Sequence, residues 1–265
     1  MAVAIAALLS LWLVRPSPPH SAPQPAAPPP AQVAPQRLAV KVLSIRPHDA
    51  GAYTQGLLLH GGSLFESTGL PGRSSLREVD PVTGEVKRRV NLASEYFGEG
   101  LALVGDRLIQ LTWQEQKAFV YGLSDFKPAG EFRYDGEGWG LCWDGRRLVM
   151  TDGSDRLTFR DPGTFAVLGE VHVTLAGQPI DRLNELECVE GSVYANVWQT
   201  DDILRIDPTS GKVTAIIDAS GLLAPPERQR AEVLNGIAWD PSRKTFLITG
   251  KLWPKMFEVT FTPRP

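Results

Sequence analysis

The sequence predicts an all-β fold: a five-bladed β-propeller closed by pairing of its N-terminal and C-terminal strands. The main observation is a phrase that recurs five times, beginning QGLLLHGG, EGLALVGD, WGLCWDGR, NELECVEG and NGIAWDPS. Its second residues are Gly56, Gly100, Gly140, Glu185 and Gly236, at spacings of 44, 40, 45 and 51 residues. A period of about 40–50 residues that is rich in short strands is typical of propeller blades.

Each repeat is expected to form four short strands joined by turns. In the first repeat, residues 57–60 are apolar, as an inner strand buried on both faces should be, and Gly61-Gly62 turns the chain back. The other strands of this repeat are expected at residues 63–67, 75–80 and 85–92. The turn before the fourth strand reads DPVTG here, DPGT in the third repeat and DPTSG in the fourth.

The end of the chain predicts how the ring closes. Only 29 residues follow Gly236, which is enough for three strands ending at 257–261 but too few for a full blade. The segment 38–45 (LAVKVLSI) can supply the missing strand, and joining the two ends in one sheet removes exposed edges. A short helix is expected near residues 225–233.

The N-terminal region predicts export. Residues 1–14 are apolar and Arg15 follows, but a membrane span needs about 20 apolar residues. We therefore expect an export signal or weak membrane anchor at 1–15, a Pro/Ala-rich linker at 16–37 and the propeller catalytic domain at 38–265. The mature protein is expected to be periplasmic, secreted or tethered to a membrane through residues 1–14.

Composition excludes several partners. The net charge of −3 gives no sign of the clustered basic surface that nucleic acid requires. The four histidines are scattered and no Cys/His metal spacing occurs, so we expect no metal and no cofactor. The two cysteines, Cys142 and Cys188, lie one position apart in the repeat frame and should point to opposite strand faces. Buried thiols are therefore favoured over a disulfide. A monomer is expected.

The residues that precede the second position of each repeat form the first candidate ring. They are Gln55, Glu99, Trp139, Asn184 and Asn235. Each enters an inner strand, so together they should surround one mouth of the central channel. The alternative is that they are ordinary turn residues, which suits Asn but not Gln, Glu or Trp.

A second ring follows from hairpin geometry, because the strand that returns to this mouth brings a residue about thirteen positions later beside the first ring. These residues are Gly69, Trp113, Gly153, Trp198 and Lys251. Glu66 and Asp152 lie close by on the same returning strands. They either reach the site or satisfy backbone N–H groups, and the sequence favours neither.

This set of residues suits proton transfer. A single Glu among indoles is desolvated, which raises its pKa and makes it a candidate general acid–base. Carboxamides and Lys251 can donate to a developing oxyanion, and indole faces can hold an amine cation. Without a Ser–His pair or a Cys at the mouth, acyl-enzyme chemistry is not expected.

Ten ordered phrases, among them YTQGL, YFGEGL, GEGWGL, LNELE, ANVWQTD and TGKLWPK, resemble the plant and bacterial type of glutaminyl cyclase. The resemblance spans about residues 45–260 and implies a five-bladed propeller that converts N-terminal Gln of peptides and proteins to pyroglutamate with release of ammonia. It implies Glu99 as the acid–base, with Lys251 and Asn184 as further catalytic residues. The resemblance also places Gln55, Phe97, Trp113, Trp139 and Trp198 in the substrate pocket. Asn235, from the first ring, and Glu66, from the returning strand, are taken as further substrate-binding candidates.

Two other functions remain open from the sequence. Glu99, Asn184 and Asn235 could surround Ca²⁺ in a metal-dependent, lactonase-like hydrolase, because hard cations take oxygen ligands. Alternatively, the aromatic residues could form a platform that binds peptides or sugars without catalysis.

Overall fold

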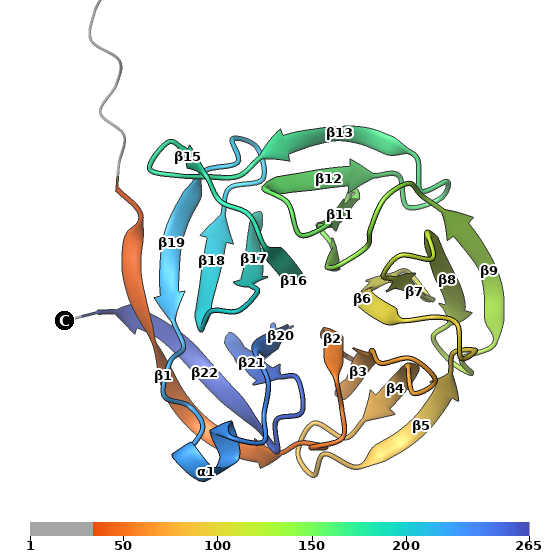
Figure 1. Cartoon of the computed structure of the whole chain (residues 1–265), viewed down its shortest axis with the longest axis horizontal. Coiled ribbons are helices and arrows are strands. Elements are labelled where there is room, and N and C mark those ends of the chain that lie inside the picture. The colour runs from red at the N-terminus through yellow and green to blue at the C-terminus, as the bar shows by residue number, and fades with distance from the viewer. Residues whose placement is uncertain (1–33, 265) are drawn as a thin grey trace, which may run out of the picture. The chain divides into compact units, whose positions relative to one another are not determined.

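The computed structural model describes residues 34–264, which form strands and one short helix (Figure 1). The expected export segment and nearly all of the expected linker lie outside the described residues. Helix α1 (Pro225–Arg228) falls within the region where the sequence predicts a short helix and begins with two prolines. No helix within 34–264 is long and apolar enough to cross a membrane.

Three sheets have four antiparallel strands each, in chain order. The first contains β2 (Thr54–His60), β3 (Ser63–Thr68), β4 (Ser75–Val79) and β5 (Val86–Asn91). The second contains β6 (Gly98–Val104), β7 (Arg107–Thr112), β8 (Lys117–Gly122) and β9 (Pro128–Arg133). The third contains β10 (Leu141–Trp143), β11 (Leu148–Met150), β12 (Arg156–Arg160) and β13 (Val167–His172).

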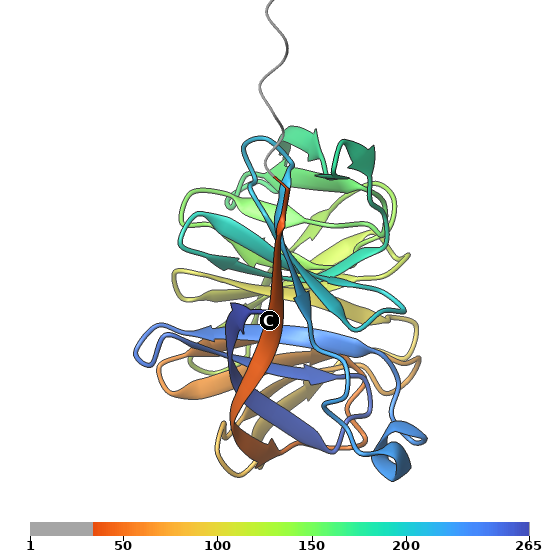
Figure 2. The same cartoon turned by 90° about the vertical axis from the view of Figure 1, so that its left-hand side faces the viewer.

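An eight-stranded sheet contains both ends of the domain. Its order is β16 (Leu183–Val189), β17 (Ser192–Val197), β18 (Asp202–Ile206), β19 (Val213–Asp218), β1 (Gln36–Pro47), β22 (Lys255–Pro263), β21 (Thr245–Gly250) and β20 (Leu234–Asp240). Strand β1 pairs antiparallel with β22 and parallel with β19. This pairing of the two ends confirms the sequence prediction. Figure 2 shows the side of the domain where the two strands lie next to each other. A separate two-stranded sheet joins β14 (Thr174–Leu175) and β15 (Gln178–Pro179).

The sheets are arranged around a common centre in a propeller-like fold, with the first strand of each group innermost (Figure 1). Five hydrophobic clusters fill the spaces between neighbouring groups of strands. Leu58 and Phe65 of the first sheet, for example, pack with Leu101 and Leu108 of the second. The core is therefore distributed between sheets around the ring.

The repeated glycine is needed where inner strands converge. A Cβ on Gly56 would lie 2.6 Å from the Leu101 nitrogen, and one on Gly140 would lie 2.1 Å from the Asn184 oxygen. Neither approach leaves room for a side chain. Glu185 replaces this glycine in the fourth repeat, and its buried carboxyl accepts the Leu57 N–H at 3.1 Å and the Ile237 N–H at 2.9 Å. Glu185 thereby links β16 to the inner strands β2 and β20.

The cysteines form a disulfide, which corrects the expectation of buried thiols. Cys142 of β10 and Cys188 of β16 have Cα atoms 5.6 Å apart. In a ring of sheets, each sheet packs one face against the opposite face of its neighbour. Side chains on opposite faces of consecutive sheets therefore point toward each other, so the offset of one repeat position brings the sulfurs together.

Candidate active site

Four residues of the first predicted ring occupy the second position of an inner strand. They are Gln55 on β2, Glu99 on β6, Asn184 on β16 and Asn235 on β20, and all four are buried. The pairing with the next strand shifts register at each of these positions. An irregularity of this kind takes a residue out of the ladder and redirects its side chain. Local strand geometry therefore makes these four side chains available to a site.

Hydrogen bonds join three of these residues in a row. The Asn235 side-chain amide donates to the Gln55 side-chain oxygen at 3.1 Å and to the Thr54 carbonyl at 2.9 Å. Gln55 then donates from Nε2 to Oε1 of Glu99 at 3.0 Å. Because Asn235 fixes the orientation of the Gln55 amide, Gln55 presents its N–H to the carboxyl of Glu99.

Glu99 is 5% exposed, and burial raises its pKa well above the ordinary value. The positive charge of Lys251 opposes this rise, whereas the nearby carboxylates of Glu137 and Glu115 add to it. A carboxyl whose pKa lies closer to neutrality can both accept and return a proton at physiological pH.

Lys251 is held in the same buried region. Its Nζ lies 4.9 Å from the centre of the Tyr53 ring, a cation–π arrangement. Burial lowers the pKa of Lys251, and the charges of Glu99 and Glu232 partly oppose this. The Tyr53 hydroxyl donates to Glu232 at 3.0 Å, which fixes the ring beneath the ammonium. Tyr53 contributes to the site although the repeat alignment did not select it.

Aromatic rings form the wall of the site. Phe97 packs edge-on against Trp113 with centroids 5.7 Å apart, and Trp139 packs edge-on against Trp198 at the same distance. Glu137 connects the two pairs, because its Oε2 accepts the indole N–H of Trp113 at 2.8 Å and that of Trp139 at 2.9 Å.

Glu137 is a functional candidate that the sequence argument missed. It lies two residues before Trp139 and therefore outside both predicted rings. The phrase GEGWGL contains it, and an acidic residue so close to a predicted site indole was the available signal.

The two glycines of the second ring leave space that aromatic rings fill. A Cβ on Gly69 would lie 2.3 Å from the Phe97 ring, and one on Gly153 would lie 2.7 Å from the Trp139 ring. These glycines let Phe97 and Trp139 lie close to the returning strands.

Glu66 does not lie with the other candidates as a free carboxylate. Its two oxygens are taken up by Arg77, by Thr54 at 2.6 Å and by His48 at 3.1 Å. The charges of Arg77 and His48 outweigh the effect of burial and lower the pKa of Glu66. Glu66 is therefore part of a buried ion-pair network behind Gln55. Asp152, the other carboxylate left open, pairs with Arg156 at 2.8 Å.

Two buried acceptors of the candidate site have no hydrogen-bond partner among residues 34–264. They are the side-chain oxygens of Asn184 and Asn235. A buried unpaired acceptor costs roughly 1–3 kcal/mol, so its persistence favours a ligand that donates N–H groups. No group of three or more His, Cys, Asp or Glu side chains within 34–264 has the arrangement of a metal site.

The fold and the candidate site together define a class of protein: a propeller-like protein with a buried carboxyl, Glu99, on an inner strand and a set of aromatic side chains nearby. Family comparison is more specific. A model described as glutamine cyclotransferase matches residues 17–261, and the chain belongs to that family.

Individual relatives agree. Over 225 residues the chain is 43% identical to the glutaminyl-peptide cyclotransferase of Arabidopsis thaliana, which covers 83% of this chain and 70% of that protein. The crystal structure of Myxococcus xanthus glutaminyl cyclase superimposes with a TM-score of 0.80 at 42% identity, covering 87% of this chain and all of that one. A β-propeller domain from Myceliophteria thermophila, with a TM-score of 0.50 at 12% identity, shares the fold alone.

Proposed function

We propose that this protein is a glutaminyl-peptide cyclotransferase that converts N-terminal Gln of peptides and proteins to pyroglutamate and releases ammonia. The observation that carries the proposal is the buried Glu99, with its raised pKa, between Gln55 and an aromatic wall. The family and both similar enzymes support the same reaction.

The reaction needs one group that moves a proton between two nitrogens. The substrate α-amine attacks the side-chain carbonyl carbon, forming a C–N bond and an oxyanion. Glu99 accepts the proton lost by the attacking nitrogen and delivers it to the amide nitrogen. The bond between the side-chain carbonyl carbon and its original amide nitrogen then breaks. The products are a five-membered lactam and ammonia. Because nucleophile and electrophile are already in one molecule, the enzyme contributes mainly proton transfer and exclusion of water.

The other site residues have roles that fit this chemistry. The Lys251 ammonium stabilises the oxyanion as it develops. The unpaired oxygens of Asn184 and Asn235 accept N–H groups of the substrate amine and amide. Phe97, Trp113, Trp139 and Trp198 surround the substrate and exclude water. All these residues come from one chain, so a monomer suffices.

The test is incubation of the purified protein with a Gln-initiated peptide, followed by mass spectrometry. The expected result is a product lighter by one ammonia. The same peptide with an acetylated N-terminus lacks the nucleophile and should remain unchanged. Binding of the free peptide without loss of ammonia would favour the non-catalytic binding module and refute the proposal.

A lactonase-like hydrolase that uses Ca²⁺ is the second alternative, and the site disfavours it. Lys251 contributes a positive charge beside Glu99, and this charge opposes a cation there. If a chelator abolished cyclisation and added Ca²⁺ restored it, a metal-dependent mechanism would replace the one proposed here.

The ring is inferred to have five blades. Three are the four-stranded sheets, and the eight-stranded sheet divides between β19 and β1 into two further groups of four. The five hydrophobic clusters alternate with these five groups, which supports the division.

We also propose export, with residues 1–15 as signal or weak anchor, 16–37 as linker and 38–265 as the catalytic domain. The disulfide between Cys142 and Cys188 supports this, because disulfides persist mainly in oxidising compartments.

A further inference from the structure

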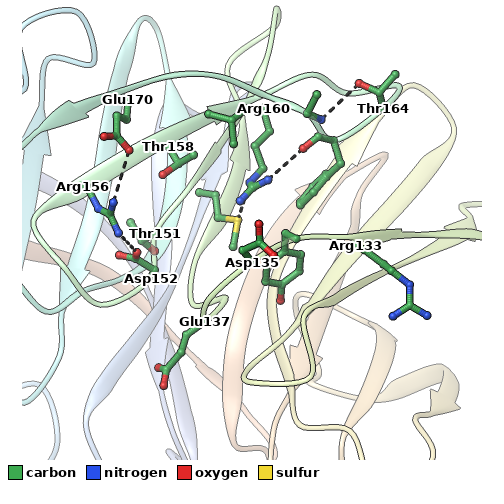
Figure 3. Close-up of a pocket in the computed structure, with 15 residues that line it drawn as sticks. Arg133, Asp135, Glu137, Thr151, Asp152, Arg156, Thr158, Arg160, Thr164 and Glu170 are labelled. Atoms are coloured by element: carbon green, nitrogen blue, oxygen red, sulfur yellow. Dashed lines mark hydrogen bonds and ion pairs between the residues drawn. The ribbon is translucent and has the colours of Figure 1, made fainter.

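A cavity lies beside the candidate active site, between the second and third sheets. Its volume is about 380 Å³, and its lining comes mainly from residues 133–137, 150–152 and 156–170. Figure 3 shows Arg160 and Asp135 near the middle of the lining, with Arg156, Asp152 and Glu170 grouped to one side.

Arg160 departs from the repeat. It is the last residue of β12 and precedes an Asp-Pro turn. The last residues of β4 and β18 also precede Asp-Pro, and they are Val79 and Ile206, both buried apolar side chains. Because a hydrophobic residue occupies the equivalent position in two other sheets, the fold itself does not require an arginine there.

Arg160 is only 8% exposed, and its guanidinium is incompletely paired. It donates from Nη1 to the Phe165 carbonyl at 3.1 Å and from Nε to the Met150 sulfur at 3.1 Å. Among residues 34–264, no carboxylate forms an ion pair with it within 4.0 Å. The guanidinium also lies over the Phe165 ring at 4.8 Å and the Tyr134 ring at 5.5 Å, and the charges of Asp135 and Asp152 act on it from a distance. Because a buried charge is best compensated by a directly paired opposite charge, an anionic ligand would complete the pairing of Arg160.

The carboxylates of the cavity are not directly paired with Arg160. Glu137 accepts hydrogen bonds from Trp113, Gln114 and Trp139. Asp152 and Glu170 pair with Arg156, at 2.8 and 3.6 Å. Asp135 is exposed, where solvent screens its charge, whereas the buried Arg160 charge interacts more strongly. The inner part of the cavity therefore favours an anionic ligand, because the buried charge there is that of Arg160.

Glu137 connects this cavity to the active site. It lines the cavity and also accepts the indole N–H groups of Trp113 and Trp139. A peptide whose first residue lies at Glu99 and whose chain continues past Glu137 therefore enters the cavity.

We propose that this cavity is a substrate subsite in which Arg160 binds the carboxylate of an acidic residue downstream of the N-terminal Gln. A guanidinium forms two parallel hydrogen bonds with a carboxylate, which gives both affinity and orientation. The inference rests on the proposed function, because it takes the ligand to be the rest of the substrate peptide.

The test uses a set of Gln-initiated peptides in which one Glu is moved along otherwise neutral positions. Affinity is measured by calorimetry with the full chain carrying Glu99→Gln, so that the peptide is not consumed. We expect about tenfold tighter binding when Glu occupies one particular position than when Gln does. Arg160→Met in the same background should abolish this ratio, and it should fold because Val79 and Ile206 occupy the equivalent positions.

The matched control is Arg205→Met, which changes an arginine of the corresponding strand β18 that does not line the cavity. It should leave the ratio intact. The proposal is overturned if no Glu position is preferred, or if the preference survives Arg160→Met. It is also overturned if Ala-initiated acidic peptides bind equally well, because the cavity would then be an independent carboxylate site. Turnover of the neutral Gln peptide by the wild-type protein tests the proposed function separately.

Discussion

Replacing Glu99 with Gln isolates proton transfer from every other property of the site. The side chains have nearly the same shape, and Oε1 of the new Gln can still accept the Gln55 amide that now lies 3.0 Å from Glu99. General acid–base catalysis contributes about 10²–10⁴-fold, which is about 3–5 kcal/mol of activation free energy. We expect kcat for a Gln-initiated peptide to fall by that factor.

The same substitution should not destabilise the fold. Burial opposes the charge of Glu99 and raises its pKa, so a neutral amide removes an unfavourable ionisation above that pKa. The unfolding temperature should equal or exceed that of the wild type at neutral pH. The assay is ammonia release, with thermal unfolding measured on the same samples.

Glu115→Gln provides a matched control, because it makes the same chemical change beside Glu99 at a carboxyl oxygen that has no hydrogen-bond partner. It should change kcat only slightly. The assignment of Glu99 fails if Glu99→Gln keeps near wild-type kcat, or if Glu115→Gln reduces kcat equally.

Three further predictions test other parts of the structure. Lys251→Met removes the charge that lowers the pKa of Glu99, so the acidic limb of kcat/KM should move to higher pH; an unchanged limb would contradict the coupling. Glu66→Gln leaves the buried Arg77 without its carboxylate and should lower the free energy of unfolding by about 3–5 kcal/mol. Arg133→Gln, at an exposed pair, should change it little, and equal effects would refute the network. Burial raises the pKa of Glu187 to about 8, so the folded state holds a proton that the unfolded state has lost, and stability falls as pH rises toward 8. Glu187→Gln should reduce this fall in thermal unfolding measured across that range, and an unchanged slope would contradict it.

The repeat frame selected most residues of the candidate site, because a ring fold places equivalent positions together. Gln55, Glu99, Asn184 and Asn235 were predicted from one offset, and the structure joins three of them by hydrogen bonds. Their register shifts were not predictable, because an irregular pairing depends on two strands and the repeat frame describes each strand separately.

Residues outside the frame were missed or misplaced for physical reasons. Tyr53 and Glu137 act through neighbours, Lys251 and the indoles, so no single offset selects them. Glu66, predicted to bind substrate, pairs with Arg77 on the adjacent strand, and that pairing depends on register, which the sequence did not reveal. The prediction for the cysteines considered only which face of its own strand each side chain occupies. The disulfide forms between two neighbouring sheets, where opposite faces meet.

The pairing of β1 with β22 has a consequence for the order in which the domain can fold. Strand β1 is among the first parts of the domain to be synthesised, yet its antiparallel partner is the last strand, with Leu38 opposite Pro263. Its other partner, β19, begins at Val213 and also comes late. Contacts between such distant residues slow folding, so the first strand stays without its partners until the chain is nearly complete. A nascent chain therefore carries an open edge until its final segment emerges.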